Sequence, residues 1–290
     1  MAQNRAPALN AEATPPASST YQHIIAFMIN CAIRIDDSRW QDWLQALTAS
    51  QRLDGFECDA GNFNSQAFVS AVTKHNLHCL HARDLLPGDS VAILTHAVEH
   101  DAMGALRRNI FDAMVYAAPA ETAVFSLQLR LDRCAEADFP AQSLRLASFL
   151  QSLLDAPLDT PYAIAIQVRQ PPPFPQSLEW QRAIDICGIA NSNRIGLCLH
   201  FHPDDFTAAP RLSPAQILAE CADKLRAICF HYNPLAGETL FDDEQQEWAA
   251  LLLQQHYNGL VTFCPEVNAS TNPADLCEDA ESWADFYRAS

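Results

Sequence analysis

The chain has 290 residues, of which 49% are hydrophobic and 18% are charged, and its formal net charge is -17. Such a charge repels nucleic acid and anionic lipid, and no apolar run reaches the roughly 20 residues that a membrane span needs. We therefore expect neither nucleic acid nor a membrane as a partner. The ten cysteines form no C-x-x-C pair, which favours reduced thiols packed as small core residues in a cytoplasmic protein.

The first twenty residues differ in composition from the rest of the chain. They are rich in Ala, Pro and Ser and contain no apolar core. This composition predicts a disordered tail over residues 1–20 and argues against a secretory signal. The remaining residues, 21–290, alternate short apolar runs with segments of helical periodicity, which indicates a single folded domain.

The first half of the domain contains four predicted strands separated by helices. A strand over residues 23–33 precedes a helix over 39–50, for which Asp36, Asp37 or Ser38 provides the N-cap. The pattern continues with strands at 55–60, 77–82 and 122–129 and helices at 65–75 and 90–118, the last broken near Gly104.

The second half repeats the same alternation. The predicted strands are 162–168, 195–200, 227–231 and 259–264, and the helices are 141–154, 178–190, 214–224, 244–257 and 277–289. Ser213 and Pro214 are typical of a helix start, and Asp242 or Asp243 is expected to cap the helix at 244–257. Residues 171–175 are proline-rich and are expected to form a loop.

Eight strands alternating with helices predict a single (β/α)8 TIM barrel. The strand segments are almost continuously apolar, as expected for strands that are covered on both faces. The chain has no G-x-G-x-x-G motif after its first strand and no phosphate-binding P-loop motif. We therefore expect no nucleotide cofactor.

Polar side chains end nearly every predicted strand, and in a TIM barrel these ends form one face where the chemistry is found. Glu57 and His81 end the second and third strands and are candidate acid or base groups. His200, His202 and His231 end the sixth and seventh, and Cys264 ends the eighth. Converging imidazoles with a thiolate suit a divalent metal such as Zn, Mn or Fe, although each histidine could equally be an ordinary hydrogen-bonded residue.

Four of the eighteen basic residues also lie at or just beyond strand ends, namely Arg34, Arg83, Arg130 and Arg169. In so acidic a chain, this concentration points to a small anionic substrate held through its phosphate or carboxylate, with Asn233 as a further polar contact. The alternative is that these arginines pair with nearby acids such as Asp36, Asp84 and Asp132.

The order of these strand ends resembles the xylose isomerase-like TIM barrels, the sugar phosphate isomerase/epimerase superfamily. The resemblance spans residues 22–266 and rests on the segments GFECDA, LHCLHA, AIAIQV, IGLCLHFH, AICFHYNP and HYNGLVTFCPE, which occur in that order. It implies an isomerase or epimerase of the same fold. It also implies a divalent metal bound by Glu, Asp, His and Glu at the ends of the fifth to eighth strands, with the two glutamates moving protons.

At the matching positions this chain has Gln167, His200, His231 and Cys264. Only His231 is retained, while Glu266, two residues beyond Cys264, could restore one acid. Three interpretations remain. The protein is an isomerase, epimerase or lyase with a rebuilt metal site; it is an inactive barrel that serves as a binding or partner subunit; or it is a metal-free enzyme that uses Glu57, His81 or His231 as acid or base. A homo-oligomer is compatible with each interpretation.

Overall fold

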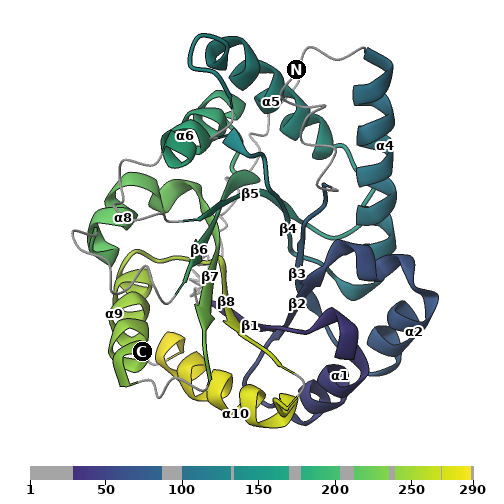
Figure 1. Cartoon of the computed structure of the whole chain (residues 1–290), viewed down its shortest axis with the longest axis vertical. Coiled ribbons are helices and arrows are strands. Elements are labelled where there is room, and N and C mark those ends of the chain that lie inside the picture. The colour runs from purple at the N-terminus through teal and green to yellow at the C-terminus, as the bar shows by residue number, and fades with distance from the viewer. Residues whose placement is uncertain are drawn as a thin grey trace, which may run out of the picture.

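The fold is a closed barrel of eight parallel strands in the order β1-β2-β3-β4-β5-β6-β7-β8 (Figure 1). The computed structural model describes residues 29–86, 100–131, 134–169, 178–202, 212–234, 239–268 and 270–288. The strands are β1 (Asn30–Arg34), β2 (Gly55–Asp59), β3 (Cys79–Arg83), β4 (Val124–Leu127), β5 (Ala163–Arg169), β6 (Ile195–Phe201), β7 (Leu225–Tyr232) and β8 (Leu260–Pro265). The predicted TIM barrel is thus confirmed.

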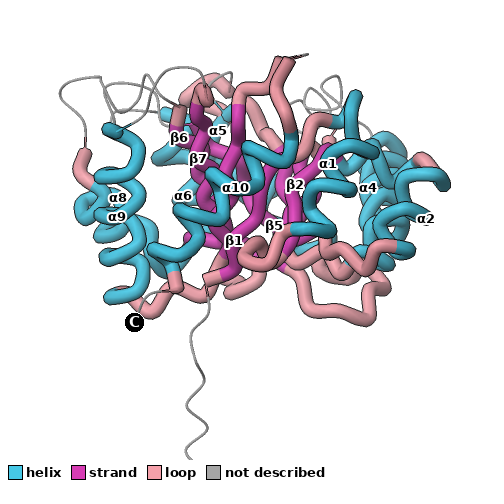
Figure 2. Tube along the Cα trace, turned by 90° about the horizontal axis from the view of Figure 1, so that it is seen from below, coloured by secondary structure: helices cyan, strands magenta, loops and turns pink. Residues whose placement is uncertain are grey.

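Helices surround the barrel on its outside, so that the strands form an inner layer (Figure 2). Within the described residues they are α1 (Trp40–Ala49), α2 (Gln66–Lys74), α4 (His100–Ala117), α5 (Phe139–Leu153), α6 (Leu178–Ala190), α8 (Pro214–Cys221), α9 (Thr239–Gln254) and α10 (Pro273–Ala284). This arrangement brings all eight strand ends to one face of the barrel.

The predicted elements agree with the structure in type and differ mainly at their ends. Helix α8 begins as predicted, with Ser213 and Gln216 forming a reciprocal capping box. Helix α9 begins at Thr239, so Asp242 and Asp243 lie inside it instead of at its cap. Gly104 lies within an unbroken α4. The predicted tail at 1–20, the proline-rich loop and residues 90–99 of the predicted long helix lie outside the described residues.

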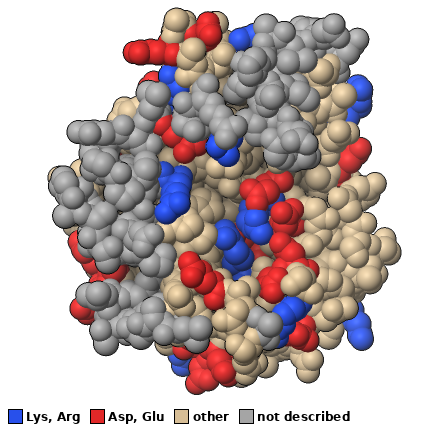
Figure 3. Space-filling view, viewed as in Figure 1, with Lys and Arg blue, Asp and Glu red and all other residues tan. Residues whose placement is uncertain are grey.

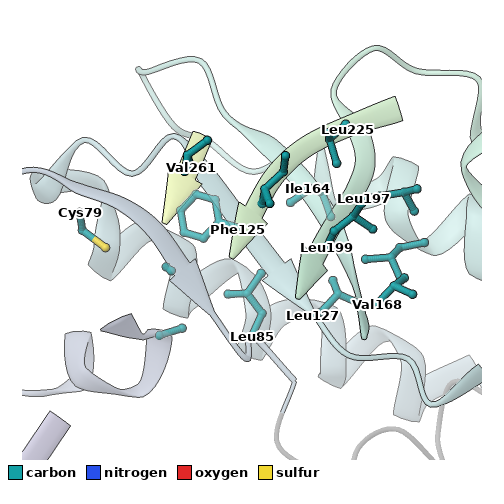
Figure 4. Close-up of a cluster of buried hydrophobic side chains, with 14 of the residues drawn as sticks. Cys79, Leu85, Phe125, Leu127, Ile164, Val168, Leu197, Leu199, Leu225 and Val261 are labelled. Atoms are coloured by element: carbon teal, nitrogen blue, oxygen red, sulfur yellow. The ribbon is translucent and has the colours of Figure 1, made fainter. Parts of the chain in front are cut away.

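The larger hydrophobic core lies between the strands and the helices. Figure 4 shows Phe125, Ile164, Val168, Leu197 and other apolar side chains of the strands in this layer. These side chains alternate along each strand with residues of the opposite face. Each strand is buried on its outer face by this layer and on its inner face by the barrel interior. This burial on both faces explains why the strand sequences are almost continuously apolar.

A second and smaller core lies inside the barrel, and it is built from small side chains. It joins residues of β1 and β4 to β8, which can meet only across the interior: Ala32, Val124, Ala165, Cys198, Ala227, Cys229, Leu260 and Cys264. A barrel interior is usually filled by bulky branched residues. Alanines and thiols leave space here, and polar side chains take it up, because Glu57, His81, Ser126 and Thr262 are all fully buried.

All ten cysteines are buried and none forms a disulfide, which confirms their predicted role as small core residues.

Among the described helices, none combines the length and apolar character that crossing a bilayer requires.

Candidate functional site

Charged side chains gather over the centre of the barrel. Figure 3 shows basic and acidic groups side by side there, around a hollow in the surface. They come from the ends of strands that are far apart in the sequence but adjacent in the barrel, since β1 pairs with both β2 and β8. The predicted polar mouth is therefore present, and its contacts can be followed residue by residue.

A buried chain of contacts, here called the inner network, joins Arg34, Glu57, His81, Ser126 and Gln167. Nε of Arg34 donates to Oε1 of Glu57 at 2.5 Å, and Oε2 of the same carboxylate lies 2.8 Å from Nδ1 of His81. Nε2 of His81 lies 2.6 Å from Oγ of Ser126, which accepts a hydrogen bond of 2.9 Å from Nε2 of Gln167. The network thus crosses five consecutive strands.

The protonation of the inner network follows from its charges. Burial by itself would raise the pKa of Glu57, but the positive charges of Arg34 and His81 outweigh burial and hold it well below its usual value. Burial likewise opposes the charged imidazole of His81, but the carboxylate of Glu57 prevails and raises the pKa of His81 to about 10. At neutral pH the pair is therefore a carboxylate and an imidazolium.

This protonation decides what Ser126 can do. Glu57, His81 and Ser126 are arranged in the order of a catalytic Ser-His-acid triad. A triad needs a neutral imidazole to accept the serine proton, whereas the His81 imidazolium donates both of its N–H groups. Ser126 is also fully buried. The arrangement therefore fixes the barrel interior and does not generate a nucleophile.

Arg83 lies beside the inner network but is surrounded by acids. Its guanidinium forms ion pairs with Asp84 and, at 3.2 Å, with Asp37, and it lies 3.8 Å from a carboxylate oxygen of Asp59. The predicted alternative that arginines pair with nearby acids thus holds for Arg83 and Asp84. It does not hold for Arg34, whose partner is Glu57 on the neighbouring strand and not Asp36.

The other predicted anchors lie at or beyond the ends of β4, β5 and β7. Arg130 follows β4 in a left-handed conformation with φ of 49°, and Arg169 is the exposed last residue of β5. Asn233 directly follows β7. Glu266 is exposed after β8, and its backbone N–H donates to the carbonyl of Tyr232 at 2.7 Å. No contact in the described part of the chain links Glu266 to the inner network.

Three of the predicted metal ligands meet in a cluster here called the histidine stack. Nδ1 of His200 lies 3.1 Å from Nε2 of His231, and the ring of His202 stacks on that of His231 with centroids 3.9 Å apart. Burial and the positive charge of Arg34 lower the pKa of His200 to about 3 and that of His231 to about 2. Both imidazoles are therefore neutral at physiological pH.

Three thiols lie close to the inner network, within the barrel. Sγ of Cys229 is 3.6 Å from Sγ of Cys198 and 3.4 Å from Oε2 of Glu57. Two sets of donor atoms lie close enough to share one ion, namely His81, Cys198 and Cys229, and Glu57, Cys229 and Cys264. These donor atoms are close enough to hold an ion, but His81 is protonated and Glu57 is already paired with Arg34, so a metal would have to displace a proton or an ion pair.

These sets are not the one that the resemblance implies. Among the described residues neither set contains His200 or His231, and Cys264 is the one matching residue that belongs to a set. Nε2 of Gln167 donates hydrogen bonds to Oγ of Ser126 and to Oδ1 of Asp84. This amide nitrogen has no lone pair to offer a metal ion. Gln167, His200, His231 and Cys264 therefore do not converge on one ion as the ligands of the family would.

A cavity of about 760 Å³ opens beside the mouth, between α4 and the ends of β2, β3 and β4. Asp59 and Asp84 form its inner wall and also pair with Arg83, so the cavity adjoins the charged centre. Its other polar lining residues include Asn64, Asn109, Asp112 and Gln128. Such a lining offers oxygen and amide groups to a hydroxylated ligand.

Sequence reasoning missed Ser126, Cys198, Cys229 and the role of Asp84. The predicted strand 122–129 extends beyond the end of β4 at Leu127, so attention fell on Arg130 beyond the strand and not on Ser126 within it. A lone serine inside the apolar run TAVFSLQL was the available signal. Asp84 reaches Gln167 from a left-handed backbone conformation with φ of 56°, which no spacing rule predicts.

The role of Gln167 leads to a prediction. Replacing it with glutamate, the residue of the family at this position, should lower the free energy of unfolding by about 1–3 kcal/mol, because a carboxylate would face Asp84 without a donor. Urea unfolding measures this change. Gln128→Glu, at an exposed amide after the adjacent strand, should change it by no more than about 0.5 kcal/mol. Equal effects of the two substitutions would contradict the assignment.

Comparison with known proteins finds a similar fold in several solved structures. No protein-family model matches the chain, and no curated protein sequence matches it either. Among solved structures, 3-keto-D-glucoside 4-epimerase from E. coli has a TM-score of 0.58 at 13% identity, over 89% of this chain and 99% of that one. D-psicose 3-epimerase from Clostridium cellulolyticum H10 has a TM-score of 0.59 at 11% identity, over 90% and 98%.

A third match is a fusion protein of a xylose isomerase-like TIM barrel and a 4-hydroxyphenylpyruvate dioxygenase, with a TM-score of 0.56 at 14% identity. It covers 86% of this chain and 41% of that one. At such identities the likeness establishes the fold and leaves the chemistry to the site itself. Together with the closed eight-stranded barrel, these matches show that the chain has the fold of the xylose isomerase-like TIM barrels.

Proposed function

We propose that this protein binds a small hydroxylated compound with a phosphate or carboxylate group at the barrel mouth and moves a proton between two of its carbons. The observation that carries the proposal is the position of Arg34. Its guanidinium is partly exposed, with 19% of the side chain accessible, and its positive charge helps to keep His200 and His231 neutral at the strand ends. Two proteins of the same fold are sugar epimerases, which supports a carbohydrate-like ligand.

The mouth offers two kinds of contact to such a ligand. The guanidinium of Arg34 suits an anionic oxygen because it presents several N–H donors in a fixed plane. Carboxylates and amides around the adjoining cavity, such as those of Asp59, Asp84 and Asn109, suit hydroxyl groups. A compound with one anionic end and several hydroxyls would satisfy both.

The proton would move through the histidine stack and not through Glu57. Glu57 is fully buried, and its low pKa makes it a weak base. His231 is neutral and half-buried, and its Nε2 contacts the ring nitrogen of His200. A bound anion near Arg34 would offset the positive charge that now disfavours protonation of His231. Ligand binding would therefore raise the pKa of His231 and prepare it to accept a proton.

Deuterium exchange tests this proposal without knowledge of the product. The protein is incubated in D₂O with sugar phosphates, sugar acids and small keto acids, and proton NMR follows loss of the hydrogen on the carbon next to the carbonyl. We expect exchange with at least one compound, and a loss of at least about 100-fold in His231→Gln, because general acid–base groups contribute about 10²–10⁴-fold.

His256→Gln is the matched control, since His256 lies after α9 in a left-handed turn away from the mouth. It should exchange at the wild-type rate. Exchange that persists in His231→Gln would exclude His231 as the base. Tight binding without exchange for every compound would exclude catalysis.

That last outcome would support a second candidate, a barrel that binds its ligand and does not transform it. Gln167 and Cys264 favour this candidate, because they stand where the family has its proton-moving glutamates and neither bears an acid. The amide of Gln167 donates hydrogen bonds to Ser126 and Asp84. Burial raises the pKa of the Cys264 thiol well above its usual value, so the thiol stays protonated.

A further inference from the structure

We infer that the guanidinium of Arg34 takes the place of the divalent cation in this barrel, so that the mouth carries a built-in positive charge and works without metal. The inference deepens the proposed function, since this charge would hold the anionic end of the ligand. Its structural part, the exclusion of metal by Arg34, can be tested whether or not the ligand is a sugar derivative.

The first argument is position. Arg34 ends β1 and contacts Glu57 on β2 through both Nε and Nη2, each 2.5 Å from Oε1. From there its charge acts on Cys264 of β8 and on His200 and His231 of β6 and β7. These are three of the four residues to which the resemblance assigns the metal. The sheet pairing agrees, because β1 is hydrogen-bonded to β8 and β8 to β7, where His231 lies opposite Cys264.

The second argument is charge. Glu57 is the carboxylate closest to this point, and it is already paired with Arg34 and with His81. Arg83 adds a second guanidinium 3.8 Å from the same Oε1. A divalent ion at Glu57 would have to displace Arg34 or remain next to it, and like charges so close repel strongly in a buried site. The site thus has its cation already.

The third argument is the remaining donor capacity. The contacts of Arg34 with other described residues involve Nε and Nη2 only, so Nη1 is left to donate to a ligand oxygen. Nε of Arg83 is also buried without a hydrogen-bond partner among the described residues. Nη1 of Arg34 is therefore suited to an anionic oxygen, which is the group a metal would otherwise hold, while the buried guanidinium nitrogen of Arg83 adds positive charge nearby.

Metal titration of an arginine variant gives a direct test. Mn²⁺ is the probe, because carboxylate and imidazole groups bind it and the nearby thiols bind it poorly. Isothermal titration and electron paramagnetic resonance should detect no Mn²⁺ site in the wild-type protein. Arg34→Ala, which removes the guanidinium that bonds directly to Glu57, should gain one Mn²⁺ per chain that the wild type does not bind.

Three further variants make the result specific. Arg34→Lys keeps a positive charge and should remain without Mn²⁺. Arg34→Ala combined with Glu57→Gln should lose the gained site. Arg52→Ala removes an exposed arginine that pairs with Asp285 away from the mouth, and it should behave as the wild type does. If Arg34→Ala does not fold, Arg34→Gln, which keeps the shape and removes the charge, takes its place in the same titration.

Two outcomes would overturn the inference. One is a stoichiometric Mn²⁺ site in the wild-type protein that Glu57→Gln abolishes, since metal and Arg34 would then coexist. The other is a folded Arg34→Ala or Arg34→Gln protein that gains no Mn²⁺. Inorganic phosphate, titrated into the wild type in the presence of EDTA, tests the ligand separately. If phosphate does not bind while the Mn²⁺ results hold, the proposed anionic ligand fails and the replacement of the metal stands.

Discussion

Replacing Glu57 with alanine is expected to lower the free energy of unfolding by about 3–5 kcal/mol, the usual cost of removing one partner from a buried ion pair. The physical reason is that Glu57 is fully buried and compensates two cations, Arg34 and the imidazolium of His81. Without the carboxylate, His81 must lose its proton or remain charged in the barrel interior. Urea denaturation followed by circular dichroism measures the change.

Glu266→Ala provides the matched control, because it removes an exposed carboxylate that follows a strand of the same barrel. It should alter the free energy of unfolding by no more than about 0.5 kcal/mol. In addition, Glu57→Gln and His81→Gln should be strongly non-additive, with a coupling of at least about 1 kcal/mol. A loss below about 1 kcal/mol in Glu57→Ala would mean that the inner network contributes little to stability.

The stability of the protein should have a maximum near pH 6–7 and fall on both sides. On the acid side, the folded pKa of His200 is about 3, because burial and then Arg34 oppose its charged form, whereas an unfolded histidine titrates near 6.5. The unfolded chain then binds more protons, so stability is lost as pH falls below about 6.5. His200 alone contributes up to about 1.4 kcal/mol per pH unit.

His231 and Glu57 act in the same direction on the acid side. His231 has a lowered pKa of about 2, but it is less buried, so solvent screening reduces its contribution. The folded-state pKa of Glu57 lies well below its value in the unfolded chain. Its contribution to the free energy of unfolding is therefore present above the unfolded pKa, and it is lost as pH falls through the folded-state pKa.

On the alkaline side the sign is reversed. His81 keeps its proton up to about pH 10 in the folded protein and loses it near 6.5 when unfolded. Its contribution is fully present below about pH 6.5 and is lost as pH rises towards 10. Urea unfolding between pH 4 and 10 measures both limbs. His200→Gln should flatten the acid limb and leave the alkaline limb unchanged, and identical pH profiles of the two proteins would contradict this assignment.

Much of the barrel could be predicted from the sequence, because strands and helices leave local signals. The apolar runs, their spacing and caps such as Ser65 and Ser213 depend on neighbours within a few residues. Even the polar strand ends follow from the pattern. Element boundaries were less certain, as the start of α9 and the length of β4 show, because packing against other elements decides the last turn or residue.

The sequence by itself determined a TIM barrel with a polar mouth, reduced cysteines and strand-end residues that differ from the metal ligands of the family. Only the tertiary structure decided which side chains contact one another. Arg34 meets Glu57 and not the neighbouring Asp36, and Gln167 meets Ser126 and Asp84, across 41 and 83 residues of chain. Such pairs depend on register and on the space left by small interior residues, which no local pattern records. Protonation depends on them in turn, since burial and the nearest charge set each pKa.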